Sequence, residues 1–342
     1  MSSAIFISGI SLIAIFAYSL SSDKTQFANQ MHLSIHSQPP GFSCKVLIIP
    51  SVKSEGNISF FFGDRNISEE IPIKEIHWHN KGFTFKRHGN ATNYFEEKLF
   101  NQFPPGTTRK EVEAKYLKEK YFILGTDKYG RDLLSRLIIG SRISISIGFI
   151  AVIISLLIGV FLGSLAGFFG GRIDQLIMWI INVVWSIPTL LMVIAITLAL
   201  GRGFWQVFVA VGLTMWVEVA RLVRGLVKST KEELFVQAAI TLGFSKLRLL
   251  LNHILPMLVA PLIVISTANF ASAILMESGL SFLGIGAQPP IPSWGGMVKD
   301  HFRYLLLGKP YLAILPGFAI MSLVLAFMML GNSIRDALDV RG

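Results

Sequence analysis

Long stretches that carry no charged side chain constrain this sequence more than any other feature. Residues 143–171, between Arg142 and Arg172, contain no Asp, Glu, Lys or Arg. A run of about 18 or more apolar residues is long enough to cross a bilayer. Further runs without charge occupy residues 175–201, 254–276 and 310–334, and a shorter one occupies 203–217. The later part of the chain is therefore expected to lie in a membrane.

Composition separates the front of the chain from this apolar part. Of the 342 residues, 15% are charged, whereas soluble domains average about 25%. Residues 21–142 hold 18 of the 31 Lys and Arg and 13 of the 21 Asp and Glu. The net charge of +10 is spread without one continuous basic run, which favours basic loops of a membrane protein over nucleic-acid binding. The single cysteine, Cys44, excludes an internal disulfide.

The first 22 residues form another uncharged run, strongly apolar from Ile5 to Leu20. No Lys or Arg precedes it, and the residues that follow make a poor cleavage site, so we interpret it as a retained helix rather than a signal peptide. We expect an all-α membrane protein with about six transmembrane helices: one at 1–22 and five within 121–342.

The distribution of Lys and Arg predicts the orientation. With the N-terminus inside, the short cytoplasmic segments 167–176, 221–253 and 331–342 carry nine Lys and Arg, and the opposite short loops carry four. Cytoplasmic loops are enriched in these residues. Both termini are therefore expected in the cytoplasm, and residues 23–120 form an extracytoplasmic insert after the first helix.

The insert is expected to be a small α+β domain. Residues 45–49 and 58–62 are rich in β-branched and aromatic side chains and predict strands. Residues 108–120 predict a charged helix with a capping threonine and Glu111.

His77, His79 and His88 suggest a metal site in the insert. We favour a solvated strand with incidental histidines, because neither a cysteine nor a tight carboxylate cluster completes a ligand set. No metal site is therefore predicted.

The longest cytoplasmic loop, residues 221–253, carries two amphipathic segments. Residues 231–239 are good helix formers, Gly243 interrupts them, and a second segment begins at Ser245 as an N-cap. Helical spacing alone leaves open whether these helices lie passively on the membrane or contact a partner.

The spacing of this loop resembles the EAA loop of ABC-importer permeases. Gln237-Ala238-Ala239 is followed after three residues by Gly243, and after nine more by His253-Ile254-Leu255-Pro256. The resemblance implies a coupling helix that docks on a cytoplasmic ATPase. Gln237 stands where the family usually has Glu, so a neutral hydrogen bond replaces any ion pair there. The residues expected at this contact are Leu234, Phe235, Gln237, Ala238, Ala239 and Gly243.

Further motifs in the same order extend the resemblance over about residues 121–342. They look like segments of the C-type subunit of peptide and nickel permeases, whose usual basic N-terminal arm this sequence lacks. The matching stretches are 124–137, 140–144, 167–174, 186–188, 279–284, 288–295 and 335–339.

The resemblance implies a permease subunit of an inner-membrane ABC importer that carries di- and oligopeptides. It implies a second homologous permease, two ATPases that hold ATP-Mg, and an extracytoplasmic substrate-binding protein as partners. The chain is not expected to be an enzyme or to hold a cofactor, since GxxxxGK[ST] does not occur in it. The alternatives are an importer of nickel or another small solute and, less favoured, a secondary transporter.

Three residues are weaker candidates for the substrate path or a gate. An intramembrane carboxylate indicates function by default, which singles out Glu218 and Glu277. Glu218 is also spaced to pair with Arg221, and Glu277 is expected near the outer face, in contact with substrate or with water. Pro188 is expected to kink its helix, with Ser186 bonding a freed carbonyl.

Overall fold

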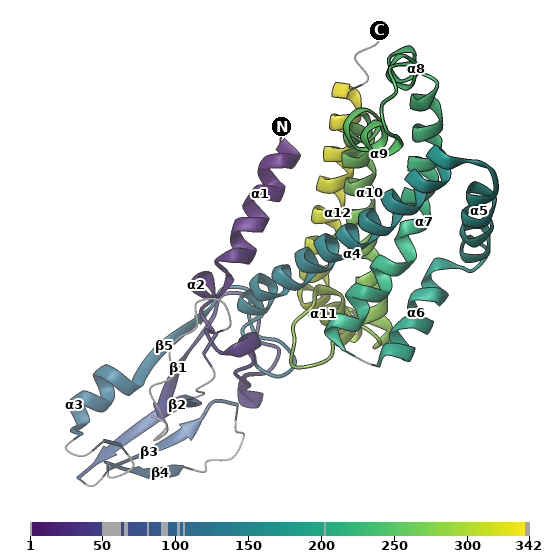
Figure 1. Ribbon diagram of the computed structural model, residues 1–342. Coiled ribbons are helices and arrows are strands. Elements are labelled where there is room, and N and C mark those ends of the chain that lie inside the picture. Colours follow the sequence, from purple (N-terminus) through teal and green to yellow (C-terminus); the bar gives the residue numbers. More distant parts are fainter. Residues whose placement is uncertain are drawn as a thin grey trace.

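The computed structural model describes residues 2–49, 63–64, 68–80, 82–89, 95–100, 103–104, 107–201 and 203–338. Figure 1 shows a helical bundle with a β-sheet at one end. Both termini of the described chain lie toward the other end, where α8 is also found (Figure 1). The long helices are α4 (Leu133–Phe169), α5 (Gly171–Trp185), α6 (Thr189–Leu200), α7 (Phe204–Lys231), α10 (Val259–Leu283) and α12 (Tyr311–Leu338).

Four described helices are long and apolar enough to cross a membrane: 133–169, 204–231, 246–283 and 311–338. The third of these includes α9 (Lys246–Leu249) and short π and 3-10 turns before α10. The pair α5 and α6 counts as a fifth span if taken together, although its halves are bent by 90°. The predicted number of about six is therefore not reached by length and composition.

The expected first span is shorter than predicted. Helix α1 (Ser2–Ile15) has 14 residues, and a distorted residue, Phe16, separates it from α2 (Ala17–Leu20). At about 1.5 Å per residue, α1 covers roughly 21 Å. This is less than the roughly 30 Å of a bilayer core, so α1 alone is too short to span it.

Close packing of α4 on α7 forms the centre of the bundle. Gly159, Gly163 and Gly167 recur every four residues and therefore share one face of α4. A Cβ at these positions would lie 2.5–2.8 Å from the Cβ atoms of valines at 219, 223 and 227 on α7. Small residues of this spacing let membrane helices approach closely. The glycine stripe thus fixes which face of α4 meets α7.

A second layer is formed by α10, which packs against α4, and by α12, which packs against α10. The rings of Phe270 and Phe327 stack with centroids 3.8 Å apart. Trp294 opens α11 (Trp294–His301), is buried, and donates from Nε1 to the carbonyl oxygen of Leu137 at 2.9 Å. This tryptophan connects the loop after α10 to α4.

The insert contains one antiparallel sheet in the order β4-β3-β2-β1-β5. Leu47, Ile71, Phe83 and Phe85 form the centre of its apolar core. The strand expected at 45–49 is confirmed within β1, and the one expected at 58–62 lies outside the described residues. The strands are β1 (Phe42–Ile49), β2 (Glu69–His79), β3 (Gly82–Arg87), β4 (Glu96–Leu99) and β5 (Leu117–Phe122).

The predicted helix at 108–120 is wrong over its last residues. It starts as expected, since Thr108 and Glu111 form a capping box around α3 (Arg109–Glu111), followed by a π turn to Tyr116. The chain then enters β5, which pairs with β1. Backbone pairing with a distant strand, together with burial of Phe122, overrides the helical preference of the charged residues there.

Polar contacts tie the insert to the bundle. Ser22 Oγ donates to Asp132 Oδ2 at 2.6 Å, and the backbone N–H of Asp23 donates to Ser135 Oγ at 3.0 Å. On the other side, Tyr311 of α12 donates to the carbonyl oxygen of Gln38 at 2.7 Å. The insert is therefore held at both α4 and α12.

Candidate functional site

A short exposed helix, α8 (Leu234–Thr241), follows α7 at the end of the bundle far from the sheet (Figure 1). Leu234 is 87% exposed and Leu242 is 75% exposed, and the Phe235 ring is also open to solvent. Burying large apolar side chains is worth about 1.5–3 kcal/mol each. An exposed apolar helix of this kind presents a surface suited to a partner.

The opposite face of α8 packs on the protein itself. Val236 and Ala239 are buried in a cluster with Val227 and Leu249. Of the six residues expected at the ATPase contact, Ala239 is thus turned inward, only 5% exposed. Its small side chain lets α8 sit close to α7 and α9, while Ala238 faces outward.

Gly243 ends α8 in a left-handed conformation, with φ of +79°. Its N–H donates to the carbonyl oxygen of Ile240 at 2.9 Å, and the N–H of Phe244 donates to that of Ala239 at 3.2 Å. This pair of bonds is the Schellman motif, which favours glycine at this position. The following N-cap at Ser245 is confirmed, because its Oγ accepts from the N–H of Arg248 at 3.4 Å.

Gln237 connects α8 back to the end of α7. Its Nε2 donates to the carbonyl oxygen of Lys231 at 2.8 Å, and its own backbone carbonyl oxygen accepts from Thr241 Oγ1 at 2.9 Å. An ionised Glu has only acceptors and could not make the first bond. The substitution noted in the sequence therefore adds a donor that caps α7.

A cluster of opposite charges connects α5 to the last turns of α7. Asp174 of α5 forms a close ion pair with Arg224 of α7, and Lys228 Nζ lies 2.8 Å from Asp174 Oδ2. Lys231 Nζ donates to the carbonyl oxygen of Phe168 at 2.9 Å. Sequence reasoning missed this cluster. The i,i+4 spacing of Arg224 and Lys228 and the carboxylate in the preceding inner loop were the available signal.

Glu218 lines a small groove of about 80 Å³ between the α5–α6 junction, α7 and α10. Ile187 and Thr189, which flank Pro188, line the same groove. Pro188 directly precedes α6 at the 90° bend, and Ser186 Oγ donates to the carbonyl oxygen of Val183 at 2.7 Å, as expected. The structure thus brings Glu218 next to the break at Pro188.

The expected pair of Glu218 with Arg221 does not form. The Arg221 guanidinium stacks 3.3 Å from the centroid of the Trp185 ring, and its Nη2 donates to Asn182 Oδ1 at 3.1 Å. Arg221 is therefore drawn across to α5, because an aromatic face and an amide oxygen are available there. Glu218 stays exposed.

Glu277 does not line this groove, and it is enclosed by the protein instead of open to water as one of the two expectations had it. Its side chain is 0% exposed, and Oε1 accepts from Ser281 Oγ at 2.6 Å one turn along α10. The other carboxylate oxygen, Oε2, is buried and has no hydrogen-bond partner among the described residues.

The histidines of the insert also separate. His77 packs beside Phe95, and His79 Nε2 lies 3.5 Å from Glu97 Oε1 across the sheet. Among the residues that the structure describes, no group of three or more His, Cys, Asp or Glu is arranged to hold a metal ion.

Comparison with known proteins identifies the class of chain. The dipeptide transport system permease protein DppC of Alkalihalophilus pseudofirmus is 42% identical over 215 residues, covering 63% of this chain and 70% of that protein. The oligopeptide transport system permease protein OppC of Bacillus subtilis is 40% identical, covering 70% and 78%. The glutathione transport system permease protein GsiD of Pectobacterium atrosepticum is 36% identical, covering 73% and 78%.

The family described as "Binding-protein-dependent transport system inner membrane component" matches residues 159–341, which include the last part of α4 and the bundle helices that follow it. The exposed α8 and its Schellman turn lie within this match, as does the groove beside Glu218. The chain belongs to this family of inner-membrane transport components.

Proposed function

We propose that this chain forms part of the path by which an ATP-driven importer carries di- and oligopeptides across the inner membrane. The similarity to permeases of dipeptide, oligopeptide and glutathione systems supports the peptide class of substrate. The exposed apolar helix α8 is the structural observation that carries the proposal, because it offers a docking surface at the end of the bundle away from the sheet.

In this proposal α8 is the coupling helix. Leu234, Phe235, Gln237 and Ala238 would contact the ATPase directly, since they are exposed on one short helix. Ala239 and Gly243 would shape it, one by close packing and the other by its left-handed turn. ATP and Mg²⁺ would be held by two partner ATPases, whose movement α8 would transmit to α7 and α9.

The remaining partners follow from the same class of transporter. Members of the family belong to binding-protein-dependent systems, which supports an extracytoplasmic substrate-binding protein as a partner. We further propose a second, homologous permease beside this chain. Glu218 and the α5–α6 break at Pro188 would lie along or near the path. Glu277 would stay a weaker candidate, because one of its carboxylate oxygens has no hydrogen-bond partner among the described residues.

The arrangement of the ends supports the proposed orientation. α1 begins, and α12 ends, toward the end of the bundle that carries α8 (Figure 1). If α8 meets the ATPases, both termini are cytoplasmic, and the insert at 23–120 and the α11 segment are extracytoplasmic.

The test is a charge placed on the outer face of α8. Leu234→Glu is expected to release the ATPases during purification of the complex and to reduce peptide uptake in proteoliposomes by tenfold or more. Leu306→Glu is the matched control, because Leu306 is 94% exposed at the opposite end and should retain the ATPases. Native ATPase retention and uptake in the Leu234 variant would contradict the coupling role.

A further inference from the structure

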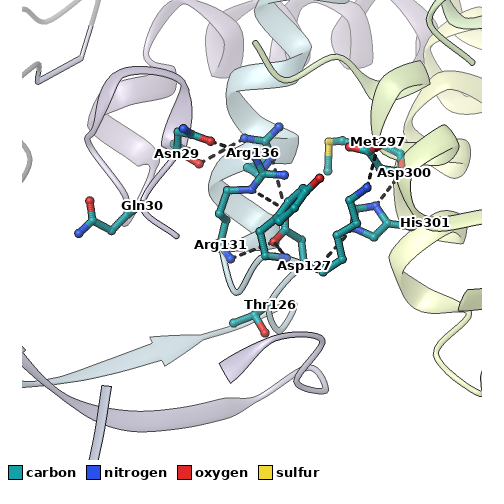
Figure 2. A network of polar contacts seen from close by, with 12 residues as sticks. Asn29, Gln30, Thr126, Asp127, Arg131, Arg136, Met297, Asp300 and His301 are labelled. Atoms are coloured by element: carbon teal, nitrogen blue, oxygen red, sulfur yellow. Dashed lines mark hydrogen bonds and ion pairs between the residues drawn. The ribbon is translucent and has the colours of Figure 1, made fainter. Parts of the chain in front are cut away.

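A polar cavity lies where the insert meets the loop between α10 and α12. Its volume is about 470 Å³, within the range of roughly 300–1,000 Å³ typical of small-molecule sites. The charged and amide side chains that line it are Asn29, Arg131, Arg136, Gln288, Lys299 and Asp300. Figure 2 shows Arg131 and Arg136 side by side between the insert and the α11 segment.

The guanidinium of Arg136 is buried and incompletely bonded. Its Nη1 donates to the carbonyl oxygens of Phe27 and Ala28 at 3.3 and 3.4 Å. Among the described residues, Nε and Nη2 have no hydrogen-bond partner, although a guanidinium carries five N–H donors. The open donors belong to a residue that lines the cavity.

The carboxylates near Arg136 also bond to other donors. Asp127 Oδ2 lies 3.8 Å from Arg136 Nε, but it accepts from Arg131 Nε at 2.7 Å. Asp300, which also lines the cavity, pairs with Lys128 at 3.0 Å. Asp23 faces the same region from the insert, and its oxygens accept from backbone N–H groups of the insert.

A third cation, Lys299, belongs to the exposed part of the lining. Lys299 is exposed, lines the cavity, and has no ion pair among the described residues. Of the charged residues that line the cavity, Arg131, Arg136 and Lys299 are cations and Asp300 is an acid, so positive charge is in excess in the lining. The nearby Gln288 directs Nε2 to the carbonyl oxygens of the loop at 284 and 286.

We infer that this cavity binds a carboxylate, with Arg136 as the buried anchor and Lys299 in the exposed part of the lining. Arginine is suited to this because its planar fork bonds both oxygens of a carboxylate. The source of the carboxylate rests on the proposed function: it is either the C-terminus of a peptide or an acidic side chain of the substrate-binding protein. Both sources are on the proposed extracytoplasmic side.

The first arm of the test uses the assembled importer in nanodiscs without the binding protein. Alanyl-alanine and its C-terminal amide are titrated by calorimetry. The acid is expected to bind at least tenfold tighter than the amide. Lys299→Gln should weaken binding of the acid by about three- to tenfold. Arg136→Gln should abolish binding. Arg303→Gln is the control, since Arg303 is an exposed cation that does not line the cavity.

The second arm measures the dissociation constant of the binding protein from the same nanodiscs. If Lys299→Gln weakens binding by three- to tenfold for the binding protein alone, the carboxylate belongs to the binding protein. If the variant weakens binding of the peptide acid in the first arm, the carboxylate belongs to the peptide. Lys299 makes no described bond, so its replacement leaves the fold intact even if Arg136→Gln does not fold. Equal binding of acid and amide, together with unchanged affinity for the binding protein, overturns the inference.

Failure of this inference is distinguishable from failure of the proposed function. If peptide uptake is normal and neither arm shows a change in binding, the inferred carboxylate site is rejected and the proposed function stands. If the assembly prefers the acid over the amide but takes up no peptide, the carboxylate site stands and the proposed function is rejected.

Discussion

Arg131 donates from Nε to Oδ2 of Asp127 at 2.7 Å, and both side chains are shielded from solvent. Asp127 Oδ1 also accepts from the backbone N–H groups of Tyr129 and Arg131, at 2.8 and 2.9 Å. One carboxylate thus fixes the turn that leads into α4 and positions the cation beside Arg136. The pair connects the local chain path to the network of polar contacts shown in Figure 2.

Replacing this carboxylate should be strongly destabilising. Asp127→Asn leaves the buried Arg131 without its counterion, and breaking a buried pair costs about 3–5 kcal/mol. The measurement is thermal unfolding of the purified chain in detergent, followed by tryptophan fluorescence. Asp300→Asn is the control, because the Lys128–Asp300 pair is partly exposed and should change stability by about 1 kcal/mol or less. Equal effects of the two variants would contradict the buried-pair argument.

The glycine stripe of α4 predicts a steric effect inside the bundle. Gly163→Val adds a branched side chain where even a Cβ would lie 2.8 Å from that of Val223, so α4 and α7 must separate. Overpacking of this kind costs about 1–3 kcal/mol. Gly225→Ala on α7 is the matched control, since nothing lies within 4 Å of the point that its Cβ would occupy. We expect a lower melting temperature for the Gly163 variant and a native one for the Gly225 variant. A native melting temperature for both variants would refute the close contact.

The left-handed turn after α8 predicts which side chains position 243 accepts. Gly243→Val should cost about 1–2 kcal/mol at the turn, because a branched residue is strained at positive φ. Gly243→Asn should be tolerated, since Asn adopts this conformation more readily. Peptide-stimulated ATPase activity of the assembled importer should fall for Val and stay near native for Asn. Similar activities of the two variants would show that the turn is not required for coupling.

His301 makes stability depend on pH. Its Nδ1 lies 2.7 Å from the carbonyl oxygen of Met297, and its Nε2 accepts from the N–H of Lys128 at 3.3 Å, an arrangement that requires the neutral ring. Burial lowers the pKa of His301, against the opposing influence of the Met297 carbonyl and of nearby Asp127 and Asp300. Lys128 adds to the lowering of this pKa.

Since the unfolded chain takes up this proton near the ordinary histidine pKa of about 6.5 and the folded chain only at lower pH, stability is lost as pH falls through that window. The melting temperature of the native chain should therefore drop between about pH 7 and pH 5. His301→Asn should show a smaller drop, and an identical pH profile for both proteins would exclude His301 as the cause.

The sequence could predict most of the helical framework and the position of the proposed coupling loop. Uncharged runs located the apolar segments because membrane burial acts on each segment by itself. Ser245 and Gly243 marked helix ends through local backbone chemistry, and the structure has both where they were expected. Residues 117–120 were mispredicted because pairing with β1 is not a local property.

Which helix faces meet was decided by the tertiary structure. The inward turn of Ala239, the contact of Arg221 with Trp185 and the enclosure of Glu277 depend on neighbours that the sequence does not place. Asp174 meets Arg224 across 50 residues, and Asp127 lies beside Arg136 only because the turn before α4 folds back. Short-range patterns fix spans and caps, whereas the packing of distant segments fixes charge pairs and cavities.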